Sequence, residues 1–173
     1  GLGTGGWHVV HWNLTAGEWA RSGPGHLMKL RYTSLQLDTG AAEETAPEID
    51  TDLGGGPVVI AGLHSQLPVL VAAVDSVRRG TRIAYVMTDG GALPLALSDT
   101  VADLVDRGLL AGTVTAGHAF GGDHECLNVP SALAVARHLL DAEIVIVAMG
   151  PGVAGTGSKL GFTGLEVAPA LDA

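Results

Sequence analysis

Four polar segments of this sequence each follow a short apolar run, and their side chains are of types that transfer protons or bind anions. The candidates for ligand binding in the first segment are His64, Ser65 and Gln66, and the candidates for proton transfer in the next two are Asp89, His118 and Asp123. Histidine and carboxylate groups are common general acids and bases, so this set indicates proton transfer on a bound small molecule.

The fourth segment, AMGPGVAGTGSKLGFTG at 148–164, is rich in glycine. It contains the G-x-G-x-x-G spacing of a dinucleotide loop, but further glycines delay the helix that such a loop needs. It also differs from a P-loop, because Ser158-Lys159 reverses the required order of lysine and hydroxyl residue. Free backbone N–H groups, hydroxyls and a lysine can still hold an anion. The predicted ligand contacts are Gly150, Gly152, Gly155, Thr156, Gly157, Ser158 and Lys159.

Each of these segments also has a structural interpretation. Ser65 stands where a helix N-cap is wanted, and Asp89 before two glycines suits a turn. A nucleophile elbow at Ser65 is not supported, because the glycine two residues later is missing. The glycine segment is alternatively a structural loop that packs against neighbouring loops or a subunit.

A metal site is a further alternative in the segment GHAFGGDHE at 117–125. His118, Asp123 and His124 are ligand types for a metal-assisted hydrolase, but the spacing of the two histidines is not a recognised ligand spacing. No metal is therefore predicted, and no cofactor is assigned. A Cys126 nucleophile has no identifiable orienting partner in the sequence.

The elements that must position these residues alternate between strand and helix. Short, β-branched runs predict buried parallel strands at 57–62, 82–88, 112–117 and 143–149. Apolar faces with start and stop signals predict helices at 66–79, 99–107 and 130–140, and a capping box at 163–166 predicts one more. The predicted fold is α/β, an open, mostly parallel sheet with flanking helices in a Rossmann-like three-layer arrangement over 58–173. All four polar segments then lie at the carboxyl edge, where ligands of such sheets bind, whereas the connections at the other edge are plain turns.

Two segments precede this domain. Alternating patterns at 7–14 and 27–38 predict an N-terminal antiparallel β segment over 1–38. Residues 39–57 carry five acidic side chains and no apolar period, which predicts a flexible, solvated loop. Because the chain stops just after its last helix begins, we expect a fragment of a longer chain, with the α/β domain incomplete at its C-terminus.

Composition limits the partners. The formal net charge is −9 with only nine Lys and Arg, which argues against nucleic acid as the main partner. No apolar run has the length of a membrane span, and a single cysteine fits a reducing compartment, so we expect a cytoplasmic protein without a membrane partner. A small molecule is the expected partner. A homo-oligomer that uses the region of Trp7, Trp12 and Trp19 is the non-catalytic alternative.

A resemblance to a known family is carried by longer strings in the same segments. These are HLMKLRYTSLQ (26–36), AGLHSQLP (61–68), YVMTDGGALPLALS (85–98), GTVTAGHAFGGDHECLN (112–128) and AMGPGVAGTGSKLGFTG (148–164). They resemble a bacterial family described as domain of unknown function 3866. The resemblance implies chains longer at both ends, and it brings no activity, cofactor or catalytic residue with it.

Overall fold

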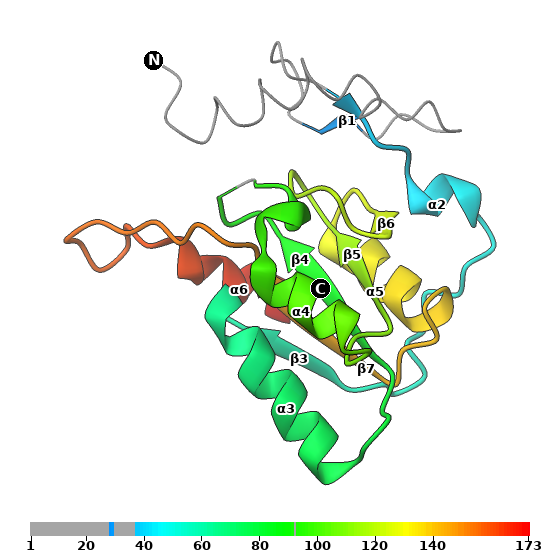
Figure 1. The fold of residues 1–173 in the computed structure, drawn as a ribbon. Helices are drawn as coiled ribbons and strands as arrows, with labels where there is room; N and C mark the ends of the chain where they lie inside the picture. Colours follow the sequence, from blue (N-terminus) through cyan, green and yellow to red (C-terminus); the bar gives the residue numbers. More distant parts are fainter. Residues whose placement is uncertain (1–27, 30–36, 92) are drawn as a thin grey trace.

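A five-stranded, all-parallel sheet forms the centre of an α/β fold in the computed structural model, which describes residues 28–29, 37–91 and 93–173 (Figure 1). The spatial order of the strands is β3-β7-β4-β5-β6. Their bounds are Val58–Ala61 for β3, Ile83–Thr88 for β4, Gly112–Thr115 for β5, His124–Glu125 for β6 and Ile144–Met149 for β7. The predicted fold class and the four predicted strands are confirmed.

The central strands are apolar on both faces because helices cover both faces of the sheet. Along β4, Ile83, Tyr85 and Met87 face one hydrophobic core, and Ala84 and Val86 face the other. All five side chains are at most 2% exposed. This two-sided burial explains why the strand reads as an almost continuous apolar run.

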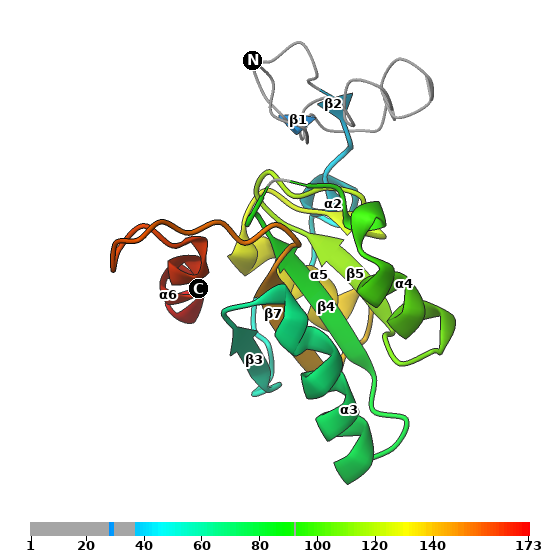
Figure 2. The same cartoon turned by 60° about the vertical axis from the view of Figure 1, so that its left-hand side comes forward.

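The helices divide between the two faces (Figures 1 and 2). On one face lie α3 (Leu67–Val77) and α4 (Asp99–Asp106), and on the other lie α5 (Val129–His138) and α6 (Val167–Leu171). Side chains cap two of them. Ser98 Oγ accepts a hydrogen bond from Val101 N at the start of α4, and Asn128 accepts one from Ser131 N at the start of α5. Three short 3₁₀ turns complete the domain: η1 (His64–Gln66), η2 (Leu95–Leu97) and η3 (Thr163–Glu166).

Several local predictions are wrong. Strand β1 (Met28–Lys29) pairs antiparallel with β2 (Leu37–Asp38), so 27–38 is not one continuous strand, while 7–14 lies outside the described residues. Ser65 does not cap a helix, because the N-cap position of η1 is Leu63 and that of α3 is Gln66. The expected capping box at 163–166 does not form either. Instead the Thr163 hydroxyl bonds to Ala154, whose N–H donates to it at 3.0 Å.

Part of the acidic segment 39–57 packs on the domain in place of a wholly solvated loop. It contains the short helix α2 (Ala42–Thr45), and Ala41 and Ala42 are buried. Glu43 Oε1 accepts hydrogen bonds from Leu127 N at 2.8 Å and from the Ser131 hydroxyl at the start of α5. In the part of the chain that the structure describes, no helix is both long and apolar enough to cross a membrane.

Candidate functional site

The carboxyl edge of the sheet is divided around β7. Strand β7 lies between β3 and β4, which lead to α3 and α4 on one face, whereas the chain leaving β7 leads to α6 on the other face. A crevice forms where neighbouring parallel strands send their connections to opposite faces, and ligands of open α/β sheets bind there. The topology therefore makes the end of β7 the candidate site.

His64 stands in η1 on one side of this crevice, with both ring nitrogens hydrogen-bonded. Nδ1 lies 3.1 Å from the Tyr85 hydroxyl, and Nε2 lies 2.7 Å from Ser98 Oγ. The Tyr85 hydroxyl also donates to the carbonyl oxygens of Ala148 and Met149, at 3.3 and 3.1 Å. We name this group of side chains the His64 cluster (His64, Tyr85 and Ser98). It joins η1, β4 and the start of α4, and Tyr85 connects it to the end of β7.

Burial sets the protonation of this cluster. It lowers the pKa of His64 below its ordinary value, and a hydrogen bond with the Met149 backbone opposes the change only in part. Burial likewise raises the pKa of Tyr85, so the phenol keeps its proton. The imidazole is therefore neutral at neutral pH and is able to accept a proton.

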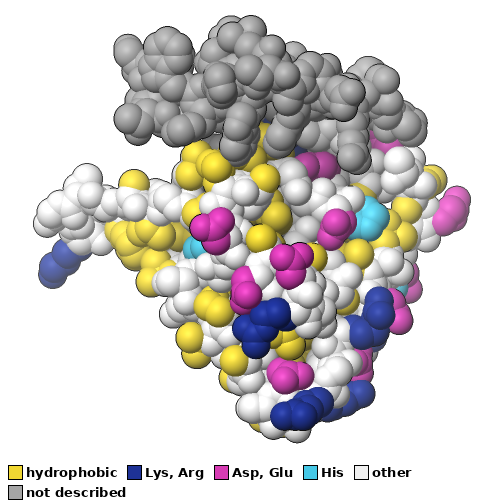
Figure 3. All heavy atoms as spheres, viewed as in Figure 1, with side chains coloured by type: hydrophobic (Ala, Val, Ile, Leu, Met, Phe, Trp, Pro, Cys, Tyr) yellow, Lys and Arg dark blue, Asp and Glu magenta, His cyan; other side chains and the backbone are white. Residues whose placement is uncertain are grey.

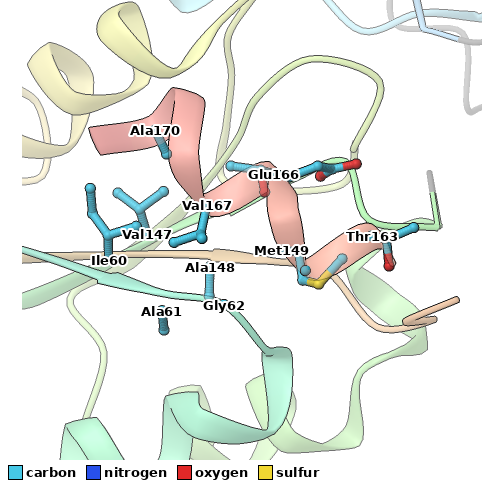
Figure 4. A pocket seen from close by; sticks show the side chains of 12 residues that line it. Ile60, Ala61, Gly62, Val147, Ala148, Met149, Thr163, Glu166, Val167 and Ala170 are labelled. Carbon is cyan, nitrogen blue, oxygen red and sulfur yellow. The ribbon is translucent and has the colours of Figure 1, made fainter. Parts of the chain in front are cut away.

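A small cavity opens on the other side of the crevice, under η3 and α6. Its volume is about 10 Å³, roughly what a single water requires. Figure 4 shows Ile60 and Val147 rising from the sheet toward Val167 and Ala170 of α6. Glu166, at the rim, accepts a hydrogen bond of 3.1 Å from Gly90 N. The cavity and the His64 cluster both border Met149.

Asp89, a predicted proton-transfer residue, anchors the loop that follows β5. One oxygen of its carboxylate, Oδ1, accepts hydrogen bonds from the backbone N–H groups of both His118 and Ala119, the latter at 2.8 Å. The other oxygen lies so near Gly117 that an added Cβ would stand 2.7 Å from it. The structure thus brings Asp89 and His118 together through the backbone of the loop, and the His118 side chain is exposed.

Asp123 closes the same loop from its other end. Its Oδ2 accepts hydrogen bonds from the backbone N–H and the hydroxyl of Thr113, at 2.8 and 3.0 Å. The arrangement seats the two-residue strand β6 beside β5. Among residues 28–29, 37–91 and 93–173, no group of three His, Cys, Asp or Glu side chains is placed to hold a metal ion.

A buried lysine lies at the carboxyl ends of β5 and β6, where no pattern in the sequence predicts it. Lys29 is fully buried, and its Nζ donates to the carbonyl oxygens of Gly117 at 2.7 Å and Cys126 at 3.3 Å. It forms an ion pair of 3.4 Å with Glu125, which also accepts a hydrogen bond from Thr115. Burial lowers the pKa of Lys29 and raises that of Glu125, and their mutual attraction opposes both changes.

The lone cysteine is not suited to nucleophilic attack. Cys126 is fully buried, and burial raises the pKa of its thiol to about 12. A thiol with so high a pKa holds almost no thiolate at neutral pH.

The glycine segment has two parts. Gly150 and Gly152 lie against the loop after β4, since an added Cβ on Gly90 would stand 3.0 Å from Gly150 O and one on Gly91 3.3 Å from Gly152 O. From Gly152 onward the segment forms a projecting hairpin, which we name the arm (residues 152–165; Figures 1 and 2). Bonds across the arm join Thr156 N to Gly161 O and Thr163 N to Ala154 O, at 2.6 and 2.9 Å.

Apart from Gly152, where the arm begins, the predicted ligand residues of the arm are thereby separated from the glycines packed against the loop after β4. Six predicted ligand residues of the arm are exposed: Gly152, Gly155, Thr156, Gly157, Ser158 and Lys159. Gly150 is buried at the end of β7, and Ser65 and Gln66 are exposed beside the buried start of α3. Of the predicted ligand-binding side chains, His64 is the one placed in a polar cluster at the crevice.

Comparison with known proteins gives a family but no activity. The model of the family "Protein of unknown function (DUF3866)" matches residues 1–173. The chain belongs to this family. The resemblance noted from its sequence strings is confirmed. No curated protein and no solved structure matches the chain.

The sequence did not predict two residues of the His64 cluster, Tyr85 and Ser98. Tyr85 lies within a run of aliphatic residues that predicts a strand, and Ser98 directly precedes a predicted helix. The available signals were a tyrosine hydroxyl that needs a partner when buried and a serine at an N-cap position. Neither signal shows that both hydroxyls meet the same histidine.

A larger hollow lies at the opposite, amino edge of the sheet, at connections that the sequence indicates to be plain turns. It has a volume of about 700 Å³ and is lined by Gly54–Pro57 and the end of α3. Its charged groups are engaged nearby: Arg78 forms an ion pair of 2.6 Å with Glu143, and Arg137 donates to Ala142 O. The histidine and hydroxyl groups suited to catalysis lie at the carboxyl edge.

Proposed function

We propose that this chain binds a small molecule at the carboxyl edge of its sheet, in the crevice at the end of β7. The observation that carries the proposal is the His64 cluster, in which a neutral imidazole is held between two hydroxyls beside that crevice. A site of this kind offers a few convergent polar groups above an apolar floor, the usual composition of a ligand site. The proposed compartment is the cytoplasm, as the composition indicates.

The ligand that we propose carries a phosphate or a carboxylate. Support comes from Lys159 in the exposed arm and from the glycine backbone on the same edge, because a lysine and backbone N–H groups bind anions. Glu166 at the rim of the small cavity would repel an anion on that side. The anionic end of the ligand is therefore proposed to face the arm.

Thermal unfolding in the presence of nucleotides, sugar phosphates and carboxylates tests the proposal. A ligand at a hundred times its dissociation constant stabilises the folded state by about 2.7 kcal/mol, which raises the melting temperature measurably. We expect such a rise with at least one anionic compound and a smaller rise in Lys159→Ala, an exposed substitution that leaves the fold unchanged. No rise with any compound would contradict the proposal.

We also propose that the arm binds a second copy of the chain. The observation that favours this second function is that the arm exposes four large apolar side chains: Val153, Leu160, Phe162 and Leu165. Figure 3 shows hydrophobic side chains gathered where the arm leaves the body of the molecule. Exposed apolar surface of this kind marks interaction sites, and a second copy is the partner that is always present.

A further inference from the structure

We assign the single ring proton of the neutral His64 to Nδ1, because this tautomer satisfies every hydrogen bond of the His64 cluster. The carbonyl oxygens of Ala148 and Met149 only accept, and the single proton of the Tyr85 hydroxyl points to both, at 3.3 and 3.1 Å. With the Tyr85 proton on the carbonyl side, Tyr85 accepts from His64 Nδ1–H, and in this tautomer the neutral ring carries no proton on Nε2. Nε2 therefore accepts the proton of Ser98 Oγ at 2.7 Å. This is the proton arrangement of a serine that is activated by a histidine.

Both ring nitrogens are occupied, which restricts how His64 acts on a substrate. Nδ1 is held by Tyr85, and Nε2 is reached through the Ser98 hydroxyl. A reacting group therefore meets the cluster at Ser98 Oγ. Ser98 is also the N-cap of α4, so negative charge formed on a substrate there is stabilised by the positive end of the helix dipole.

We propose that Ser98 is the nucleophile of an esterase centre, with His64 as its general base and Tyr85 as the residue that positions the imidazole. The inference rests on the proposed small-molecule site and names the class of substrate as an ester of a short-chain carboxylic acid. A short acyl group is required because Ser98 is only 5% exposed and a bulky one does not reach Oγ.

The reaction consumes the ester and one water. Ser98 Oγ bonds to the ester carbonyl carbon while its proton moves to His64 Nε2. The ester C–O bond then breaks, and the proton on His64 passes to the leaving oxygen, which gives an alcohol and acyl-Ser98. Water attacks the acyl carbon and gives a proton to Nε2. Ser98 Oγ leaves and takes that proton, which releases the carboxylic acid and restores the cluster.

Covalent labelling of the full chain tests the nucleophile directly. Methanesulfonyl fluoride, whose sulfonyl group is small enough for a serine that is 5% exposed, exchanges its fluoride for an activated serine oxygen, and mass spectrometry of peptides locates the adduct. We expect the adduct on Ser98 in the wild type and in Ser65→Ala, whose serine is the exposed neighbour of His64. We expect none in Ser98→Gly, chosen because glycine keeps most of the capping energy. Labelling in His64→Gln should be about 10²- to 10⁴-fold slower, the usual contribution of a general base.

Hydrolysis of p-nitrophenyl acetate supplies a readout for Tyr85. In Tyr85→Phe the imidazolium loses the acceptor of Nδ1–H, so we expect a slower reaction and a midpoint of the pH–rate profile at lower pH. A merely structural role would leave that midpoint unchanged. Circular dichroism melts of all variants verify that they fold.

The outcomes also separate this inference from the binding proposal. Absence of an adduct on Ser98, or an adduct whose rate is unchanged in His64→Gln, overturns the esterase centre. If thermal unfolding still reveals an anionic ligand in that case, the binding proposal stands and the covalent step alone fails. If labelling succeeds while no anion binds, the nucleophile stands and the ligand class is wrong.

Discussion

Burial makes protonation of His64 unfavourable in the folded protein. Burial lowers its folded-state pKa from the ordinary 6.5, whereas the unfolded chain keeps the ordinary value. Below pH 6.5 the unfolded state therefore binds more protons than the folded state, so stability increases with pH in that range. Above pH 6.5 both states are neutral at His64 and its contribution is constant. The contribution is thus present at neutral pH and lost as the pH falls toward the folded-state pKa.

We predict that the wild type loses more unfolding free energy than His64→Gln between pH 7.5 and pH 5.5. The difference between the two proteins should approach about 1.4 kcal/mol at most, the value of one pH unit below the unfolded pKa. Urea unfolding at the two pH values measures it, and the other histidines cancel in the comparison. Equal losses in the two proteins would show that His64 is not held neutral.

Asp89 holds the start of the loop that follows β5. In Asp89→Ala the N–H groups of His118 and Ala119 lose their shared acceptor, and Ala119 is fully buried. A buried donor without a partner costs about 1–3 kcal/mol, so urea unfolding should reveal a loss of that size. Asp89→Asn keeps one acceptor oxygen and should lose less. A stability unchanged in Asp89→Ala would contradict the anchoring role.

The sequence predicted which polar residues follow the strands, but it did not predict which residues they contact. His64, Asp89 and Asp123 were singled out in the sequence because each follows a predicted strand, and all three lie in connections at the carboxyl edge of the sheet. Their partners are 34 residues away for His64 and Ser98, and 30 for Asp89 and Ala119. Such pairings depend on the order of the strands in the sheet, which no local pattern contains.

The loops after β4 and β7 meet through their glycines. Gly90 has a φ of +50°, and an added Cβ would lie 3.0 Å from Gly150 O and 3.1 Å from the Met149 side chain. Only a residue without a side chain permits this backbone approach without strain. The close approach therefore requires glycine at positions 90 and 91, and the segment that suggests a phosphate loop supplies the backbone of Gly150 and Gly152 that these positions meet.

We predict that Gly90→Ala lowers the free energy of unfolding by about 1–2 kcal/mol from the left-handed backbone alone, and by more through the contact with Gly150. Gly80→Ala is the matched control, since Gly80 has a φ of +74° and nothing within 4 Å of an added Cβ. Gly157→Ala, with open space and no positive φ, should change little. Equal effects at Gly90 and Gly80 would show that the loops do not press on each other.

Elements with a strong apolar period were predictable, and elements defined by side-chain contacts were not. The run at 143–149 gave β7 almost to the residue, and the helix predicted at 99–107 is α4. Strand β6 has the polar sequence His124–Glu125 and no apolar run. It lies beside β5 because the carboxylates of Asp123 and Glu125 bind the hydroxyls of Thr113 and Thr115.

The arm projects from the body of the α/β fold (Figure 1). Within it, Leu160 is 84% exposed at the turn between the two sides of the hairpin. Burial of such a side chain in an interface removes apolar surface from water and stabilises the complex. A two-fold arrangement places each arm on the same surface of the other copy, so one substitution changes the contact twice.

We therefore predict that the protein in solution has twice the 17.5 kDa mass of the chain and that Leu160→Asp reduces it to the mass of one chain. A charge at the centre of an apolar contact costs several kcal/mol unless it is paired, and two such charges repel each other. Light scattering after size-exclusion chromatography measures the mass. Val77→Asp is the matched control, because Val77 is 88% exposed on α3, away from the arm, and its substitution should leave the dimer intact. A wild-type mass of one chain, or a dimer that survives Leu160→Asp, would contradict a role of the arm in assembly.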